Sequence, residues 1–303
     1  MFVKSLAGLA LGVTLAGTAV LAQDITVDTA QGPVEVPQTP APLAVFDLAA
    51  VDTLTALGVS IDGVPAPIYL PYLAPVAKTA TPVGTLFEPD LEALARMAPE
   101  LIVVGGRSSA QVDTLTRLAP TIDMTIWGDG FVDQLRARLA SYGEIFGKEA
   151  EATALADTLD DKIATAAAAA EGKGNALILL TNGGKMSAYG ANSRFGWIHG
   201  ALNLPEAHAG LSDDPHGQAI SFEFLAEVDP DWILVIDRGA AIGQTGEAAQ
   251  ATLDNKLVAG TTAAQSGQIV YLDAGPIYVA GGGVQSIMGT LDELTAAFSG
   301  AES

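Results

Sequence analysis

Two stretches of the sequence decide the fold: residues 99–107, Pro-Glu-Leu-Ile-Val-Val-Gly-Gly-Arg, and residues 230–238, Pro-Asp-Trp-Ile-Leu-Val-Ile-Asp-Arg. Each opens with a proline and an acidic residue, continues as an apolar run and ends in an arginine. Unbroken apolar runs of this kind are typical of strands buried on both faces of a parallel sheet. In open α/β sheets, ligands bind beyond the carboxyl ends of the strands, where Arg107 and Arg238 stand. The pattern predicts two equivalent strands that lead to a ligand site.

The same plan continues upstream of both strands. Residues 88–98 and 221–229 each read as a short helix that ends at the proline, with Glu92 and Glu223 in the first helical turn. An acidic residue at this position complements the helix dipole, which is the ordinary explanation for both. We interpret the chain as two α/β lobes built on one plan.

A single helix is predicted to join the two lobes. Residues 148–171 are rich in Ala, Leu, Glu and Lys and contain no Gly or Pro, whereas Gly147 and Gly172 flank them. About 24 residues make a helix of ~36 Å, which is a stiff connector. We therefore expect an α/β fold of two lobes, each a small, mostly parallel sheet flanked by helices, joined by one long rigid α-helix. The predicted lobes are 23–147 and 172–303, and they should close only slightly on a ligand.

The amino-terminal residues 1–22 read as a secretory signal. Lys4 supplies the positive end, an apolar run follows, and small or aliphatic residues precede a cut after Ala22. A membrane anchor is the alternative interpretation of this run. The chain has no cysteine, which excludes disulfides, thiolate metal sites and a lipid carried on Cys. We expect an exported, periplasmic protein that is not lipidated.

Composition and motifs argue against several function classes. The net charge of −21 is unfavourable for binding nucleic acid or an anionic membrane. A hydrolytic enzyme is the rival of another class, but the sequence contains no Gly-x-Ser-x-Gly elbow, no His-Glu-x-x-His and no phosphate-binding loop. Of the three histidines, His199 is expected to pack in a helix and His208 to be solvated. We expect a binding protein and not an enzyme.

Several motifs combine arginine, histidine and tyrosine with glycine-rich turns. They are Gly-Arg107, Ala-Tyr-Gly-x-x-Ser-Arg194-Phe-Gly, His216-Gly-x-x-Ile-Ser-x-Glu223, Val-Ile-Asp-Arg238-Gly, and Val-Tyr-Leu-Asp followed by Tyr278. Together they resemble the periplasmic ferric-siderophore binding proteins of ABC importers, in the class with a helical backbone. Within that class the chain is similar to binders of ferric catecholates and petrobactin, from about residue 35 to 298.

The resemblance implies a ligand site and its residues. Arg107, Arg194 and Arg238 match three cleft arginines that face an anionic iron complex. The residue chemistry agrees, because a ferric tris-catecholate carries a charge near −3 and guanidinium groups donate to catecholate oxygens. His216 and Tyr278 match residues that in some relatives coordinate Fe(III) when the siderophore leaves positions open; a helix-capping loop histidine and a rim aromatic are the alternatives.

Two further aromatic residues are candidates for the cleft wall, and two glutamates for docking. Tyr189 and Trp127 are predicted to line the cleft, with the core as the alternative; for Trp127 the following glycine favours the wall. The resemblance implies that Glu92 and Glu223 dock onto a dimeric ABC permease. It also implies a monomer without a permanent cofactor that carries a ferric siderophore as transported ligand. A cobalamin or haem binder on the same scaffold remains the alternative.

Overall fold

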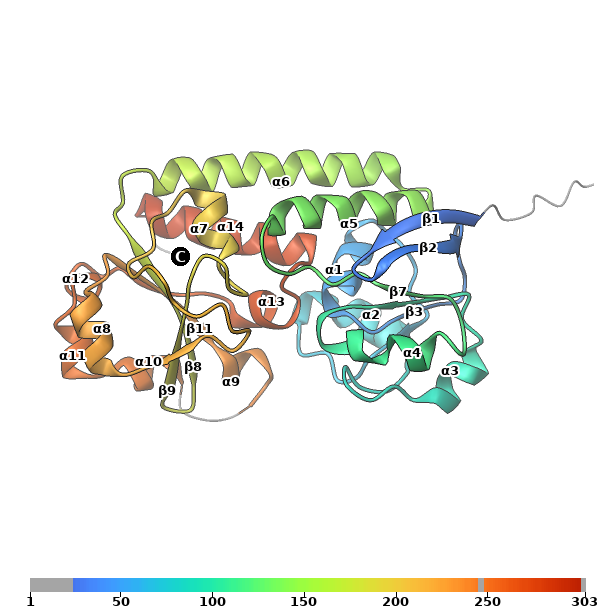
Figure 1. Cartoon of the computed structure of the whole chain (residues 1–303), viewed down its shortest axis with the longest axis horizontal. Helices are drawn as coiled ribbons and strands as arrows, with labels where there is room; N and C mark the ends of the chain where they lie inside the picture. Colours follow the sequence, from blue (N-terminus) through green and yellow to red (C-terminus); the bar gives the residue numbers. More distant parts are fainter. Residues whose placement is uncertain (1–23, 245–247, 301–303) are drawn as a thin grey trace, which may run out of the picture.

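The computed structural model describes residues 24–244 and 248–300. The chain forms two lobes side by side, and the long helix α6 (Glu149–Ala170) runs along one side of both (Figure 1). The predicted signal peptide and the cut after Ala22 lie outside the described residues. Within the described ranges, no helix combines the length and the apolar character needed to cross a bilayer.

The first lobe contains a five-stranded parallel sheet. Its order is β5-β4-β3-β6-β7, with β3 at Leu43–Val45, β4 at Gly63–Val64, β5 at Thr81–Pro82, β6 at Leu101–Val104 and β7 at Thr121–Asp123. The predicted strand is β6, and all four of its residues are buried between β3 and β7. A two-stranded hairpin, β1 (Asp24–Thr29) and β2 (Gly32–Pro37), packs its buried Val27 and Val36 into the core of the same lobe.

The second lobe has a five-stranded sheet that is mixed and not mostly parallel. Its order is β10-β9-β8-β11-β12, with β8 at Ala176–Asn182, β9 at Lys185–Tyr189, β10 at Gln218–Ile220, β11 at Trp232–Asp237 and β12 at Ile269–Tyr271. The strands β8, β11 and β12 are parallel, whereas β9 and β10 are antiparallel to their neighbours. Gly183 and Gly184 both have positive φ and reverse the chain between β8 and β9. Two consecutive glycines suit this tight hairpin turn, and the motif could have predicted it.

Short helices alternate with the strands along the chain. They are α1 (Leu48–Ala56), α2 (Ala74–Thr79), α3 (Leu91–Met97), α4 (Val112–Leu115), α7 (Trp197–Leu202), α8 (Phe222–Val228), α9 (Arg238–Ala241), α10 (Ala249–Leu253), α11 (Lys256–Ala259), α12 (Thr262–Gln265) and α13 (Ala274–Val279), with 3₁₀ turns η1 (Pro71–Leu73) and η2 (Gly106–Gln111).

The internal repeat is visible in the helices that precede β6 and β11. Helices α3 and α8 both have seven residues, both begin at a side-chain cap (Asp90 and Ser221), and both end in a left-handed residue before the proline. They lie on different lobes (Figure 1). The sequence repeat therefore corresponds to a repeat of local structure.

Three helices hold the lobes together. The connector predicted at 148–171 is α6, which packs against α5 (Phe131–Phe146) and α14 (Val284–Ser299). Gly143 on α5 allows this close contact, because a Cβ there would lie 2.9 Å from the Cβ of Ala152. Leu135 on α5 packs in the core of the second lobe, whereas Val284 on α14 packs in the core of the first. The two cores therefore share these helices.

Asp52 on α1 joins the first lobe to α14. Its carboxylate accepts hydrogen bonds from the amides of Gln285 and Ser286, at 2.8 and 3.0 Å, and from the Tyr72 hydroxyl at 2.7 Å. Burial raises the pKa of Asp52 to about 7, although these hydrogen bonds lower it. The start of α14, and with it the glycine-rich segment after α13, is thus fixed against the first lobe.

Candidate functional site: an arginine-lined cavity between the lobes

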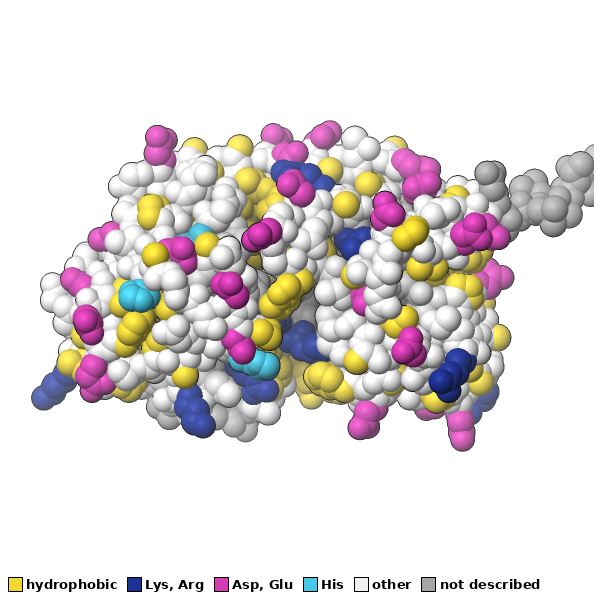
Figure 2. Space-filling model, viewed as in Figure 1, with side chains coloured by type: hydrophobic (Ala, Val, Ile, Leu, Met, Phe, Trp, Pro, Cys, Tyr) yellow, Lys and Arg dark blue, Asp and Glu magenta, His cyan; other side chains and the backbone are white. Residues whose placement is uncertain are grey.

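A cavity of about 480 Å³ opens between the two lobes. Figure 2 shows this cleft near the middle of the molecule, with cationic and hydrophobic side chains inside it. Four arginines line it, Arg107, Arg138, Arg194 and Arg238, whereas Asp47 is the one acidic side chain among its described lining residues. In a chain with a net charge of −21, this is a local excess of positive charge. Such a cavity favours an anionic ligand.

Arg107 comes from the end of the predicted strand β6 in the first lobe. Gly106 precedes it with φ 51°, a left-handed conformation that glycine adopts readily. A Cβ at Gly105 would lie 2.8 Å from a carboxylate oxygen of Asp47, so this turn also requires the absence of a side chain. The Arg107 guanidinium crosses to the second lobe, where its Nη2 donates to the Tyr278 carbonyl oxygen at 3.0 Å.

Arg194 comes from the tight loop between β9 and α7. The Ser193 hydroxyl donates to the Gly190 carbonyl at 2.6 Å, and a Cβ at Gly196 would lie only 2.0 Å from the Ala191 carbonyl oxygen. The loop can therefore close only with glycine at position 196. Its closure directs Arg194 to Tyr278: Nη2 donates to the same carbonyl that Arg107 uses, and the guanidinium lies 4.3 Å from the centroid of the tyrosine ring.

Arg238 follows β11 in the second lobe, as Arg107 follows β6 in the first. It is the first residue of α9, where the Asp237 side chain caps the helix by accepting from the amide of Ala240. Its Nε donates to the Tyr278 hydroxyl at 3.1 Å, and its Nη1 lies 3.4 Å from the side-chain oxygen of Asn182.

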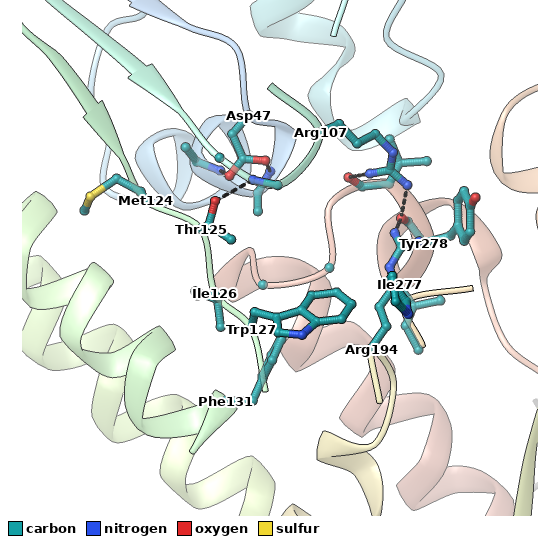
Figure 3. A pocket seen from close by; sticks show the side chains of 18 of the residues that line it. Asp47, Arg107, Met124, Thr125, Ile126, Trp127, Phe131, Arg194, Ile277 and Tyr278 are labelled. Carbon is teal, nitrogen blue, oxygen red and sulfur yellow. Dashed lines mark hydrogen bonds between the residues drawn. The ribbon is translucent and has the colours of Figure 1, made fainter. Parts of the chain in front are cut away.

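Tyr278 is therefore the residue on which all three predicted arginines converge. Figure 3 shows Arg107 and Arg194 reaching it from different elements. Burial raises the pKa of its phenol, but the hydrogen bond from Arg238 and the charges of the three arginines outweigh burial, so the pKa is lowered from its ordinary value. Burial, followed by the charge of Arg107, likewise lowers the pKa of Arg194. Arg107 and Arg194 thus lie close enough to repel one another.

His216 and Trp127 also line this cavity. His216 lies at the exposed mouth, where 92% of its side chain is accessible, and its Nδ1 is 3.1 Å from an Asp214 carboxylate oxygen. Trp127 is 44% exposed and lies beside Ile126 and Phe131 (Figure 3). Among the described residues, no three His, Asp or Glu side chains lie together as a metal-binding group.

Tyr189 is not a cleft residue, and the prediction that it lines the cleft is wrong. It is 1% exposed, it packs edge-on against Phe195 at 4.7 Å, and it does not line the cavity. The reason is the β8–β9 hairpin, which places the last residue of β9 in the core beneath the Arg194 loop. Burial raises its pKa to about 12. Of the other two histidines, His199 is buried and His208 is exposed, as predicted.

Three cavity residues were missed from the sequence. Phe87 is 61% exposed at the cavity, and Arg138 and Asp47 also line it. Arg138 lies on the face of α5 that also carries Phe131, Leu135 and Tyr142, and this helical spacing could have identified it. Asp47 follows β3 at the carboxyl edge of the sheet, the position that identified Arg107.

Glu92 and Glu223 lie outside the cavity, at equivalent places on the two lobes. Each is in the first turn of its helix and exposed. Glu92 lies 3.8 Å from Arg96 in a surface ion pair. The pKa of Glu223 is lowered by a hydrogen bond from its own backbone amide and by one from the Ser221 side chain.

Comparisons with known proteins agree with this architecture. Residues 43–276 match the family described as periplasmic binding protein. The chain belongs to this family. Two relatives are the petrobactin-binding protein YclQ of Bacillus subtilis, 32% identical over 86% of this chain and 83% of that protein, and the ferric-anguibactin-binding protein FatB of Vibrio anguillarum, 27% identical over 89% and 86%.

Solved structures of the family share the whole two-lobe arrangement. The crystal structure of YclQ superimposes with a TM-score of 0.87 at 31% identity, covering 91% of this chain and 99% of that one. The catecholate-siderophore binding protein VctP of Vibrio cholerae gives a TM-score of 0.86 at 28% identity, covering 90% and 100%. The relatives of this family member are thus substrate-binding proteins of iron uptake.

Proposed function

We propose that this protein binds a ferric siderophore of the catecholate type in the periplasm and delivers it to an ABC permease. One observation carries the proposal: Arg107, Arg194 and Arg238, from separate elements of both lobes, meet at Tyr278 in one cavity. The names of the relatives support the ligand class, since they bind petrobactin, ferric anguibactin and catecholate siderophores.

The electrostatics of the cavity support an anionic ligand in particular. Arg107 and Arg194 repel one another, and an anion between them removes this repulsion. A ferric tris-catecholate carries its charge on several oxygens, which suits several guanidinium groups better than a single point charge does. Haem and cobalamin give no comparable reason for the convergence. We propose that the protein acts by binding and release, without a catalytic step and without a permanent cofactor.

Tyr278 and His216 are proposed to complete the iron coordination when the siderophore leaves two positions open. Fe(III) is a hard cation that accepts phenolate oxygen readily and imidazole as well. The lowered pKa of Tyr278 favours the phenolate form that such coordination needs. His216 is exposed at the mouth, and its Nδ1 is held by Asp214. That leaves Nε2 for a metal.

Delivery is proposed to use Glu92 and Glu223. Both are exposed acidic residues, and the internal repeat relates them, which suits two equivalent subunits of a permease. We propose that the protein is a monomer, exported by a signal peptide that is cut near Ala22 and free of lipid.

A titration tests the proposal. Purified protein is titrated with a ferric tetradentate bis-catecholate, with haem and with cobalamin, and quenching of the fluorescence of Trp127 and the other tryptophans is followed together with the charge-transfer band. We expect saturable quenching by the ferric catecholate at micromolar concentration or below. Quenching by haem or cobalamin but not by the ferric catecholate would contradict the proposal.

A further inference from the structure

The cavity has a second polar end, beyond the three arginines that meet at Tyr278. It lies where Arg138 and Tyr142, one turn apart on α5, face the same cavity as Asp47. Its other walls are apolar and include Ala49, Ala50 and Met124. Polar side chains beside apolar walls need hydrogen-bond partners.

Arg138 is incompletely paired. Its Nη1 donates to the Asp28 carbonyl oxygen of β1 at 2.6 Å, which fixes the direction of the side chain. Its Nε is shielded from solvent without any hydrogen-bond partner. Within residues 24–244 and 248–300, its Nη2 also makes no hydrogen bond, and it is not shielded as Nε is. The guanidinium therefore retains a donor that a ligand can use.

Tyr142 supplies a second donor. Its ring is 2% exposed, and its hydroxyl makes no hydrogen bond to any described residue. Burial, and then the charge of Asp47, keeps the pKa of this phenol well above its ordinary value. The hydroxyl is therefore neutral at physiological pH and has its proton available for donation.

We propose that Arg138 and Tyr142 form a subsite for a carboxylate, carried on an arm of the siderophore that does not coordinate iron. The proposal rests on the proposed function, since it places the iron complex at Tyr278 and the arm at Arg138 and Tyr142 in the same cavity. A carboxylate fits because it brings two acceptor oxygens and a negative charge that compensates Arg138.

Asp47 is the group that opposes this binding. Its carboxyl accepts hydrogen bonds from the amides of Ala49 and Ala50, both at 3.3 Å, and it faces Arg107 and the buried Asp123 as well as Tyr142. In its ionised form it repels a second carboxylate; in its protonated form it does not. The subsite should therefore bind the arm more tightly in mildly acidic solution.

The test compares two ligands and three variants. The ligands are a ferric tris-catecholate with one pendant carboxylate and the same complex with that group converted to a methyl amide. Wild-type protein should bind the carboxylate about ten-fold or more tightly than the amide. Arg138→Gln should reduce this preference to less than about three-fold, because the variant loses more affinity for the carboxylate than for the amide.

Tyr142→Phe removes only a hydroxyl that has no partner among the residues that the structure describes, so the variant should fold normally and still lose part of the preference. Arg136→Gln is the matched control. It removes the same charge from the same helix, but its side chain pairs with Asp133 and Asp160 away from the cavity. It should keep the full preference.

The possible results distinguish failure of the subsite from failure of the proposed function. An unchanged preference in both Arg138→Gln and Tyr142→Phe would overturn the subsite, and so would an equal loss of affinity for both ligands. If wild-type protein binds neither ferric complex, the proposed function itself fails. Binding of both complexes without preference by the wild type would overturn the subsite and leave the function intact.

Discussion

Replacing Arg194 with glutamine tests the charge argument most directly. Arg194 donates to the Tyr278 carbonyl, lies over the tyrosine ring and is half-buried beside Arg107. Glutamine keeps some polar character and length but removes the charge. We expect the loop itself to survive, because Ser193 and Gly196 make its internal contacts.

The size of the effect follows from the surroundings of the guanidinium. Two unit charges at ~4 Å interact by about 4 kcal/mol at an effective dielectric constant of about 20. Removing one partner of a desolvated charge pair usually costs about 2–5 kcal/mol. The substitution also relieves repulsion from Arg107 in the free protein, which favours the lower part of this range. We therefore expect a loss of about 2–3 kcal/mol, or roughly 30- to 150-fold in Kd.

Fluorescence titration with a ferric catecholate measures this loss, and thermal unfolding verifies that the variant is folded. Arg136→Gln serves again as the control for net charge, and it should change Kd by less than about two-fold, because its ion pairs are on the surface. A folded Arg194→Gln variant that binds within about two-fold of wild type would refute the reasoning.

Three further predictions concern His216, Asp47 and Gly196. His216→Ala should shift the charge-transfer band of a tetradentate ferric complex and leave that of a hexadentate complex unchanged. If the tetradentate complex has the same band in the variant and in the wild type, coordination by this histidine is excluded. Burial raises the pKa of Asp47 to about 6, so its carboxyl is ionised at about pH 7.5 and repels an anionic chelate. Asp47→Asn should therefore bind the chelate several-fold more tightly than wild type at about pH 7.5, and the gain in affinity should vanish near pH 5, where the wild-type carboxyl is protonated. A gain in affinity that is independent of pH would contradict this prediction. Gly196→Ala should destabilise the fold by about 2–4 kcal/mol in a thermal unfolding experiment and weaken binding, because its Cβ would collide with the Ala191 carbonyl. Gly200→Ala on α7 is the control: a Cβ there meets nothing within 4 Å, so the stability should be unchanged or slightly higher in the same experiment.

The sequence predicted the parts of the fold that depend on local patterns. The strand β6 and the helix α6 lie where an apolar run and an alanine-rich segment predicted them. These signals are strong because an unbroken apolar run is typical of a strand buried on both faces, and a segment of six turns without Gly or Pro is typical of a long helix. Gly183 and Gly184 carried an equally local signal for the β8–β9 hairpin, and overlooking it led to the error over Tyr189.

The candidate site was predictable only in part. Arg107 and Arg238 could be placed because each follows a buried strand, and the carboxyl ends of parallel strands share one edge of a sheet. Helical spacing separates Arg138 from Arg136, since two positions along a helix point in different directions, but only the packing of α5 shows that Arg138 faces the cavity. The pKa of Asp47 depends on burial by distant segments, which composition does not reveal.

By itself, then, the sequence determined which segments become strands and helices, and where along them the cationic side chains stand. Only the tertiary structure decided that three of these side chains meet at Tyr278, that Tyr189 lies in the core and that Arg138 faces the cavity. The physical reason is that secondary structure follows from interactions between near neighbours in the chain. Convergence in a cavity depends instead on how two lobes pack against helices that they share, and thus on contacts between residues far apart in sequence.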